Sequence, residues 1–296
     1  MQALAVYTPG HLFSSEPPDL SSRAYRFLAE GDSWFSLGSL NPAKNSNLLF
    51  EMAFERSACA VNCASPGDTL RRMSQVNRDP VFADLLYGRR AHIWDGVLLS
   101  CGGNDLIDAA QARGPGVVPA LRLLLESDEW DAAAEGPSRY LSDAGWQTFC
   151  TYFEANLSHL LGLRDRGPSR GCPVFMHGYA FPTPRPAGAG LGIGPWLFPS
   201  VQAYGIPAAD QPGVARELVQ RLATLIARCA ADAVRFPNLH FFDTTQLAVV
   251  PARPGTTGED GDWINEIHLT WRGCEKLALP WSAQIERTVR AQRGEV

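Results

Sequence analysis

The sequence predicts an α/β fold with a parallel sheet, because short apolar runs alternate along the chain with stretches of helical periodicity. The runs are nearly unbroken in their apolar character, which is typical of strands buried on both faces. Five segments have this character: 25–30, 58–62, 93–101, 173–177 and 239–243. The chain shows no internal repeat and no boundary between two cores, so we expect one domain over 1–296.

The N-terminal half contains three of these strands. After a polar lead that contains proline, the run 25–30 ends at Gly-Asp-Ser, and apolar residues at helical spacing predict a helix over 47–56. The run 58–62 ends at Ala-Ser-Pro-Gly and is followed by a helix over 69–75. The run 93–101 ends at Gly-Gly-Asn-Asp. Each strand is therefore followed by a polar turn.

The C-terminal half contains the other two strands and two irregular stretches. We expect an insertion over the sheet edge at about 106–147, with a short helix near 120–126, and a second insertion at 178–211, rich in Gly, Pro and aromatic residues. Helical periodicity is strong in three further segments: 148–163, 214–234 and 271–290.

Composition excludes several classes of protein. The chain has 296 residues, of which 45% are hydrophobic and 19% charged, so it can bury a core and is not a disordered chain. A net charge of -5 without a Lys/Arg cluster argues against binding to nucleic acid or to an anionic membrane. No apolar run is long enough for a transmembrane segment, and no secretory signal is visible, so we expect a cytoplasmic protein. The seven scattered cysteines lack metal-ligand spacing and are expected to be reduced, so no metal site is predicted.

Polar clusters follow three of the predicted strands at the points where they end. These clusters contain Asp32 and Ser33, then Gly67, then Asn104, and a fourth cluster that ends at His268 lies in the loop before the last helix. Ligand sites in parallel sheets lie outside the carboxyl ends of the strands. We therefore expect the four clusters to meet at one edge of the sheet.

The residue types in these clusters fit acyl transfer. A serine on a tight turn after a strand is exposed, and a histidine can take its proton, which makes Ser33 the candidate nucleophile and His268 the candidate general base. The backbone N–H groups of Ser33 and Gly67 and the side-chain amide of Asn104 would stabilise the oxyanion. Each residue also has a purely structural interpretation: Ser33 and Asn104 as helix caps, Gly67 as a turn residue and His268 as a surface or core histidine.

Taken together and in this order, the four clusters resemble the motifs of the SGNH hydrolase superfamily, also called GDSL esterases and lipases. Ser33 lies in GDSWFS, Gly67 in ASPGDT, Asn104 in GGNDL and His268 in NEIHLT. The resemblance covers about 25–290. It implies a flavodoxin-like three-layer α/β/α sandwich with a five-stranded parallel sheet. It also implies ester hydrolysis through an acyl-enzyme that needs no metal and no cofactor.

The sequence departs from the family pattern beside the histidine. The family usually has Asp three residues before the His, where this chain has Asn265, and often has Pro after the His, where it has Leu269. Asn265 can orient an imidazole by a hydrogen bond but cannot stabilise it by charge. Asp262 or Glu266 could supply a carboxylate instead, or the pair could work without one. The third member of the triad stays open at this point.

The expected substrate is a small-molecule or lipid carboxylic ester with an apolar part, and a lysophospholipid, a thioester or an acetylated sugar fits the same site. One alternative is an acyltransferase that uses the same acyl-enzyme, and another is a binding or effector domain without catalysis. His177 ends the fourth strand and is expected in the core or at the pocket. The stretch 179–204 is expected to form either an apolar wall of the pocket or a packed surface loop. Oligomeric state is not predicted.

Overall fold

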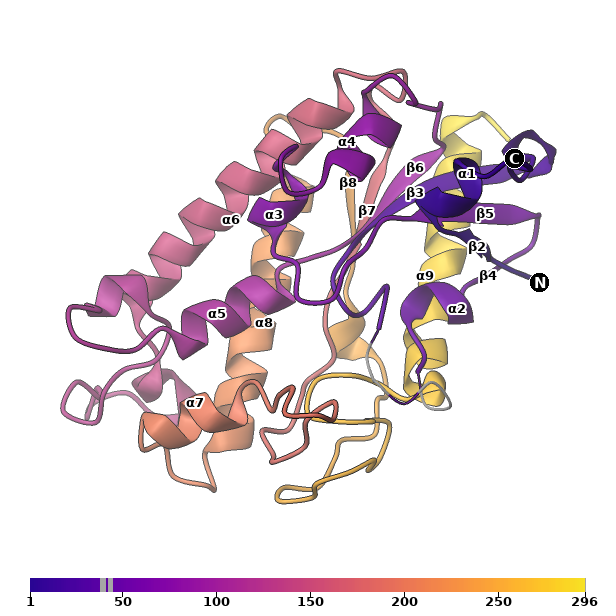
Figure 1. Cartoon of the computed structure of the whole chain (residues 1–296). Helices are drawn as coiled ribbons and strands as arrows, with labels where there is room; N and C mark the ends of the chain where they lie inside the picture. The colour runs from indigo at the N-terminus through magenta and orange to yellow at the C-terminus, as the bar shows by residue number, and fades with distance from the viewer. Residues whose placement is uncertain (38–40, 42–44, 296) are drawn as a thin grey trace.

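The computed structural model describes residues 1–37, 41 and 45–295. Its centre is a six-stranded sheet in which neighbouring strands run parallel throughout (Figure 1). In spatial order the strands are β2 (Ala5–Tyr7), β5 (Ala58–Asn62), β3 (Tyr25–Gly31), β6 (Gly96–Ser100), β7 (Val174–His177) and β8 (Leu239–Phe242). The prediction of a parallel α/β sheet is confirmed.

The sheet has six strands, so the expectation of five is wrong by one edge strand. The additional strand, β2, pairs with β5 through Ala5–Tyr7. It is only three residues long and half-buried, and it lies in the segment expected to be a polar lead, although residues 3–7 are all apolar. A second, two-stranded antiparallel sheet joins β1 (Gln2–Ala3) to β4 (Ala53–Phe54).

Helices cover both faces of the large sheet and make a three-layer sandwich (Figure 1). One face carries α9 (Trp271–Gln292), against which α2 (Leu48–Glu51) packs. The other face carries α4, α6 and α8 (Figure 1). The bounds of the remaining helices are α1 Pro9–Leu12, α3 Leu70–Met73, α4 Pro80–Leu86, α5 Gly103–Gln111, α6 Asp143–Arg164, α7 Phe198–Ala203 and α8 Gln211–Ala231. Among the described residues, 3₁₀ turns cover Leu20–Ser22, Pro119–Leu121, Gly136–Tyr140 and Thr244–Gln246.

The three long helices were predicted correctly, and the helix expected over 69–75 is present in shorter form as α3, but the other short predictions were wrong. The helix expected over 47–56 ends at Glu51, because Ala53 and Phe54 pair with β1 instead. The segment 103–111 is the helix α5, although 106–147 was expected to be an irregular insertion from its start. Near 120–126 the structure has only the turn Pro119–Leu121. Within 178–211 the helix α7 covers Phe198–Ala203.

The core consists of the strands and the inward faces of the helices. The residues of β6 are buried throughout, as a strand covered on both faces should be. All seven cysteines are free thiols. None of the helices in the described ranges combines the length and apolar character that crossing a membrane requires.

Candidate active site

The polar turns after β3, β5 and β6 lie side by side at the carboxyl edge of the sheet. Gly31, the last residue of β3, pairs with Ser100 of β6, and the N–H of Asp32 donates to the carbonyl of Ser100 at 3.1 Å. The N–H of Ser65, after β5, donates to the carbonyl of Gly31 at 3.0 Å. A Cβ on Gly31 would lie 2.7 Å from the Cβ of Ser100, so this close approach requires glycine.

Asp32 holds the turn on which Ser33 lies. One carboxylate oxygen accepts from the Trp34 N–H at 2.9 Å and from the Ser100 hydroxyl at 2.8 Å, and the other accepts from the Tyr179 hydroxyl at 2.5 Å. Burial raises the pKa of Asp32 to about 6, although these three donors act in the opposite direction. Asp32 therefore holds the turn that carries Ser33 in place.

Ser33 and His268 contact each other although they are far apart in the sequence. The Oγ of Ser33 lies 2.6 Å from Nε2 of His268, within hydrogen-bond distance. On the other side of the ring, Nδ1 of His268 lies 2.9 Å from Oδ1 of Asn265. The same Oδ1 accepts from the backbone N–H of His268 at 2.9 Å, which fixes the orientation of the amide.

These contacts determine the tautomer of His268. Because an amide oxygen only accepts, Nδ1 must carry the proton, and Nε2 is left with a lone pair that faces the Ser33 hydroxyl. Burial lowers the pKa of His268 to about 3, so the imidazole is neutral at ordinary pH. Asn265 therefore orients the imidazole ring as a carboxylate at this position would, but it contributes no charge.

The two carboxylates considered as alternatives are engaged elsewhere. Asp262 accepts from the Val250 N–H and from the Lys276 ammonium group, both at 2.6 Å. Glu266 is buried and accepts from the backbone N–H groups of residues 196–198. Within the described residues neither carboxylate bonds His268, so both act on the loops around the site rather than on the imidazole.

The three candidate oxyanion donors line one cavity together with His268. This cavity has a volume of about 350 Å³ and includes Ser33, Gly67 and Asn104 in its lining. Asn104 donates one amide hydrogen to the carbonyl of Asp68 at 2.9 Å, which leaves its second amide hydrogen for a ligand. In the ranges that the structure describes, the N–H groups of Ser33 and Gly67 donate to no other protein group. Gly67 has φ +82° in a solvent-exposed turn.

The segment 178–211 contributes to the wall of this cavity. Ala189, Ile193 and Trp196 line it, and the Trp196 ring meets the His268 ring edge-on at 5.1 Å between centroids. A smaller apolar cavity of about 40 Å³ also borders Ser33; it shares Ser33, Asn104 and Ile267 with the first but does not include His268. Two unequal cavities thus meet at the serine.

His177 lies in the core rather than in either cavity. Its ring stacks on Trp34, contacts Trp281 edge-on, and its Nδ1 bonds the carbonyl of Gly178 at 2.5 Å. Burial lowers the pKa of His177 to about 4. The stretch 179–204 was expected as a possible apolar wall, and Trp196 lines the larger cavity. Sequence reasoning missed the hydrogen bond from Tyr179 to Asp32, since Tyr179 lies in no polar cluster at a strand end.

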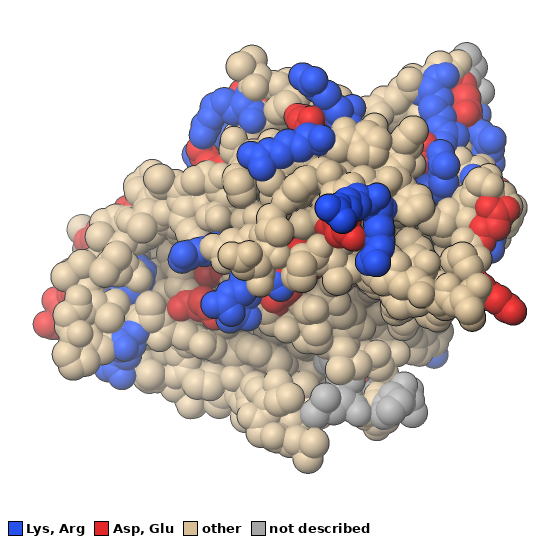
Figure 2. Space-filling view, turned by 45° about the horizontal axis from the view of Figure 1, so that its top comes forward, with Lys and Arg blue, Asp and Glu red and all other residues tan. Residues whose placement is uncertain are grey.

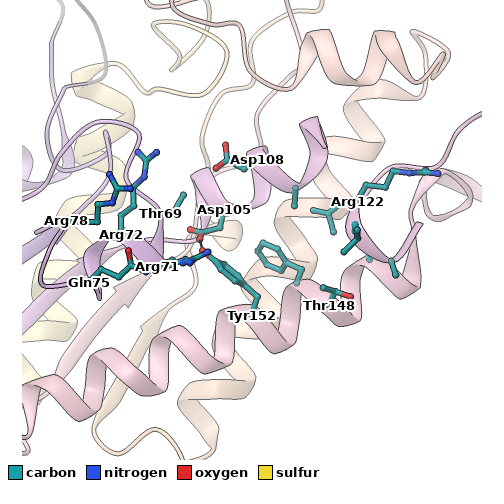
Figure 3. A pocket seen from close by; sticks show the side chains of 16 residues that line it. Thr69, Arg71, Arg72, Gln75, Arg78, Asp105, Asp108, Arg122, Thr148 and Tyr152 are labelled. Carbon is teal, nitrogen blue, oxygen red and sulfur yellow. Dashed lines mark hydrogen bonds between the residues drawn. The ribbon is translucent and has the colours of Figure 1, made fainter. Parts of the chain in front are cut away.

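A separate pocket of about 550 Å³ lies between α3, α5 and α6 (Figure 3). Arg71, Arg72 and Arg78 lie at one end and Arg122 at the other (Figure 3). Asp105 lines it as well, but its carboxylate accepts from the Leu70 N–H and from a tyrosine hydroxyl, in a structural role. On the face shown in Figure 2, Lys and Arg lie among Asp and Glu.

No family model matches the chain, and no curated protein matches it. Among solved structures it is similar to an extracellular lipase from Streptomyces rimosus, with 15% identity, a TM-score of 0.49 and coverage of 88% of this chain and 100% of the lipase. It is also similar to phospholipase A1 from Streptomyces albidoflavus, with 15% identity, a TM-score of 0.41 and coverage of 88% and 98%. A carbohydrate acetylesterase from Sinorhizobium meliloti has 12% identity, a TM-score of 0.41 and coverage of 90% and 99%.

Proposed function

We propose that this chain is a serine ester hydrolase with Ser33 as nucleophile and His268 as general base. The observation that carries the proposal is the 2.6 Å contact between Ser33 Oγ and the unprotonated Nε2 of His268, with Nδ1 held by Asn265. A hydroxyl that donates to a neutral imidazole in this way is activated for attack on a carbonyl carbon. Asn265 completes the triad as a neutral orienting group.

The reaction follows from these positions. As Ser33 Oγ attacks the carbonyl, its proton passes to Nε2, and the oxyanion accepts from the N–H groups of Ser33 and Gly67 and from the Asn104 amide. Each such donor typically contributes ~2.7–4 kcal/mol to the transition state. The imidazolium of His268 then protonates the leaving alkoxide. Water, deprotonated by the same imidazole, attacks the acyl-enzyme and releases the acid.

The two cavities favour a short acyl group on a larger alcohol. The leaving oxygen must lie near His268 to be protonated, so the alcohol occupies the 350 Å³ cavity, whose lining includes His268. The acyl group then enters the 40 Å³ cavity, which touches Ser33 but not His268. Since one water-sized probe needs ~10–15 Å³, about three heavy atoms fit there. Acyl groups of about two to four carbons are therefore favoured over long lipid chains.

The nucleophile is tested by hydrolysis of p-nitrophenyl esters from acetate to palmitate. We expect turnover by the native protein to be highest for the short chains and to fall by ~10⁴-fold or more in Ser33→Ala. Ser65→Ala, at an exposed serine after the neighbouring strand, is the matched control and should keep full activity. A fluorophosphonate should label the native protein and Ser65→Ala but not Ser33→Ala. Labelling without hydrolysis, with ester formed from an added alcohol, would identify an acyltransferase, and absence of labelling would indicate a binding domain.

The acyl pocket is tested by a pair of leucine variants in α8. Leu222 lines the small cavity, whereas Leu225, on the same helix and equally buried, does not. We expect Leu222→Ala to raise the ratio of octanoate to acetate turnover by about tenfold or more, as removal of methylenes from such a pocket does. Leu225→Ala should leave the ratio unchanged. An equal ratio in both variants would place the acyl group elsewhere.

A further inference from the structure

Three carboxyl groups gather behind the turn that carries Gly67. Glu30 lies near the end of β3, Asp68 follows Gly67, and Asp79 caps the start of α4. One carboxylate oxygen from each lies within 4.8 Å of one from each of the others. The cluster adjoins the candidate active site, because the carbonyl of Asp68 accepts the hydrogen bond from the Asn104 side chain at 2.9 Å.

Glu30 lacks a partner that its burial would require. The residue is 0% exposed, and Oε1 accepts from the Gly31 N–H at 2.8 Å, but Oε2 has no hydrogen-bond partner among the described residues. An unpaired buried carboxylate costs several kcal/mol or more, and two further carboxylates beside it increase that cost. The basic group that pairs with this cluster, Arg72, is mostly exposed and lies 3.9 Å from Asp68.

A divalent cation would meet this requirement. We propose that Glu30, Asp68 and Asp79 bind one calcium ion. Carboxylate oxygens are the ligands that hard cations take, and oxygens that all lie within 4.8 Å of one another can reach one ion at Ca–O distances of ~2.4 Å. Calcium accepts flexible, irregular coordination, whereas magnesium demands near-ideal octahedral geometry and gives up its waters reluctantly. Asp68 is only half-buried, so water can complete the coordination from its side.

The competing arrangement is a proton shared between Glu30 and Asp79. Burial and the neighbouring Asp79 raise the pKa of Glu30 well above its usual range, which is compatible with that arrangement. One proton neutralises one of three negative charges, whereas calcium neutralises two and gives Oε2 of Glu30 a partner. The ion would also fix Asp68, and with it the positions of Gly67 and Asn104.

The test is calcium binding by the full chain after treatment with EDTA, followed by titration calorimetry and thermal unfolding. We expect one Ca²⁺ per chain and a rise in Tm on the order of 5 °C at hundredfold excess over Kd, with a smaller rise for Mg²⁺. Glu30→Gln, which keeps an oxygen for the Gly31 N–H, and Asp79→Asn should each abolish both responses. Asp108→Asn, at an exposed acid outside the cluster, should leave them unchanged.

Absence of calcium binding by the native chain, or undiminished binding by Glu30→Gln, would overturn the proposal. If Glu30 and Asp79 share a proton instead, calcium would not change the Tm of the native chain. The Tm of Glu30→Gln would then depend less on pH than that of the native chain. Should Glu30→Gln fail to fold, Asp68→Asn on the half-buried member gives the same comparison. None of these measurements uses an ester substrate. The calcium proposal and the hydrolase proposal can therefore fail independently of each other.

Discussion

Replacing Asn265 by Asp would place a carboxylate where His268 now meets a neutral amide. Burial lowers the pKa of the native imidazole to about 3, and the Asn265 oxygen, 2.9 Å from Nδ1, offers no charge against this effect. Asn265 is only 1% exposed, so solvent would screen the new charge poorly. We expect Asn265→Asp to raise the pKa of His268.

The size of the increase follows from the contact distance. With Oδ1 and Nδ1 2.9 Å apart, the centres of the two charged groups lie somewhat farther from each other. Two unit charges ~4 Å apart at an effective dielectric constant of ~20 attract by ~4 kcal/mol, or about three pKa units. Burial of the new carboxylate costs desolvation energy that offsets part of this attraction, so we expect the pKa of His268 to rise by ~1–3 units. Because imidazolium forms during attack, kcat should rise by roughly 10–100-fold at pH 8.

The assay is an NMR titration of ¹⁵N-labelled imidazoles, with the His268 signal assigned by its loss in His268→Gln. The native His268 should stay neutral down to about pH 4, and Asn265→Asp should shift its midpoint upward by the amount given above. Turnover of p-nitrophenyl acetate is measured alongside. A native midpoint near the ordinary histidine value of ~6.5 would refute the argument from burial. An unchanged midpoint in Asn265→Asp would refute the assigned contact.

Three further substitutions test the supports of the site. Gly31→Ala should destabilise the chain by ~1–3 kcal/mol in urea unfolding, because its Cβ would lie 2.7 Å from the Cβ of Ser100; unchanged stability would show that the strands can separate there. Tyr179→Phe should cost ~1–3 kcal/mol and lower kcat more than it changes KM, since Asp32 loses a hydroxyl donor at 2.5 Å; an effect on KM alone would contradict this positioning role. Burial raises the pKa of Glu266 to about 7. The protonated form stabilises the fold fully below the unfolded pKa of ~4.5, and this stabilisation is lost as pH rises through about 7. In Glu266→Gln the free energy of unfolding should therefore decline less between pH 5 and pH 8 than in the native chain. An equal decline in both would contradict the raised pKa of Glu266.

The sequence allowed the sheet and the meeting of the site residues to be predicted, because both depend on local patterns. Apolar runs marked the buried strands, and polar residues at their ends had to share one edge. The edge strand β2 was missed because the apolar run that contains it, 3–7, is short and is followed by a polar segment with several prolines, which gave the whole lead an irregular pattern. The helix over 47–56 was overestimated, since pairing of Ala53 and Phe54 with β1 overrides the helical spacing.

The orienting partner of His268 could not be chosen from the sequence. Asn265, Asp262 and Glu266 all lie within six residues of His268, and spacing alone does not say which side chain turns toward the ring. Contacts from distant segments decide it: Lys276 and Val250 bind Asp262, while the backbone of 196–198 binds Glu266. Such long-range hydrogen bonds leave no periodic trace in the chain.

Glu266 connects the wall of the larger cavity to the loop that carries His268. It stands two residues before His268, accepts from three consecutive backbone N–H groups at 196–198, and is followed by Ile267, which lines both cavities. Replacing the segment 189–198 to alter the substrate range would therefore shift the position of the His268 ring, unless the replacement kept those three N–H groups in place. Directed evolution of this chain should find new specificities more readily through substitutions in α5 and α8. These helices line the small cavity and do not take part in the hydrogen bonds of Glu266 described above.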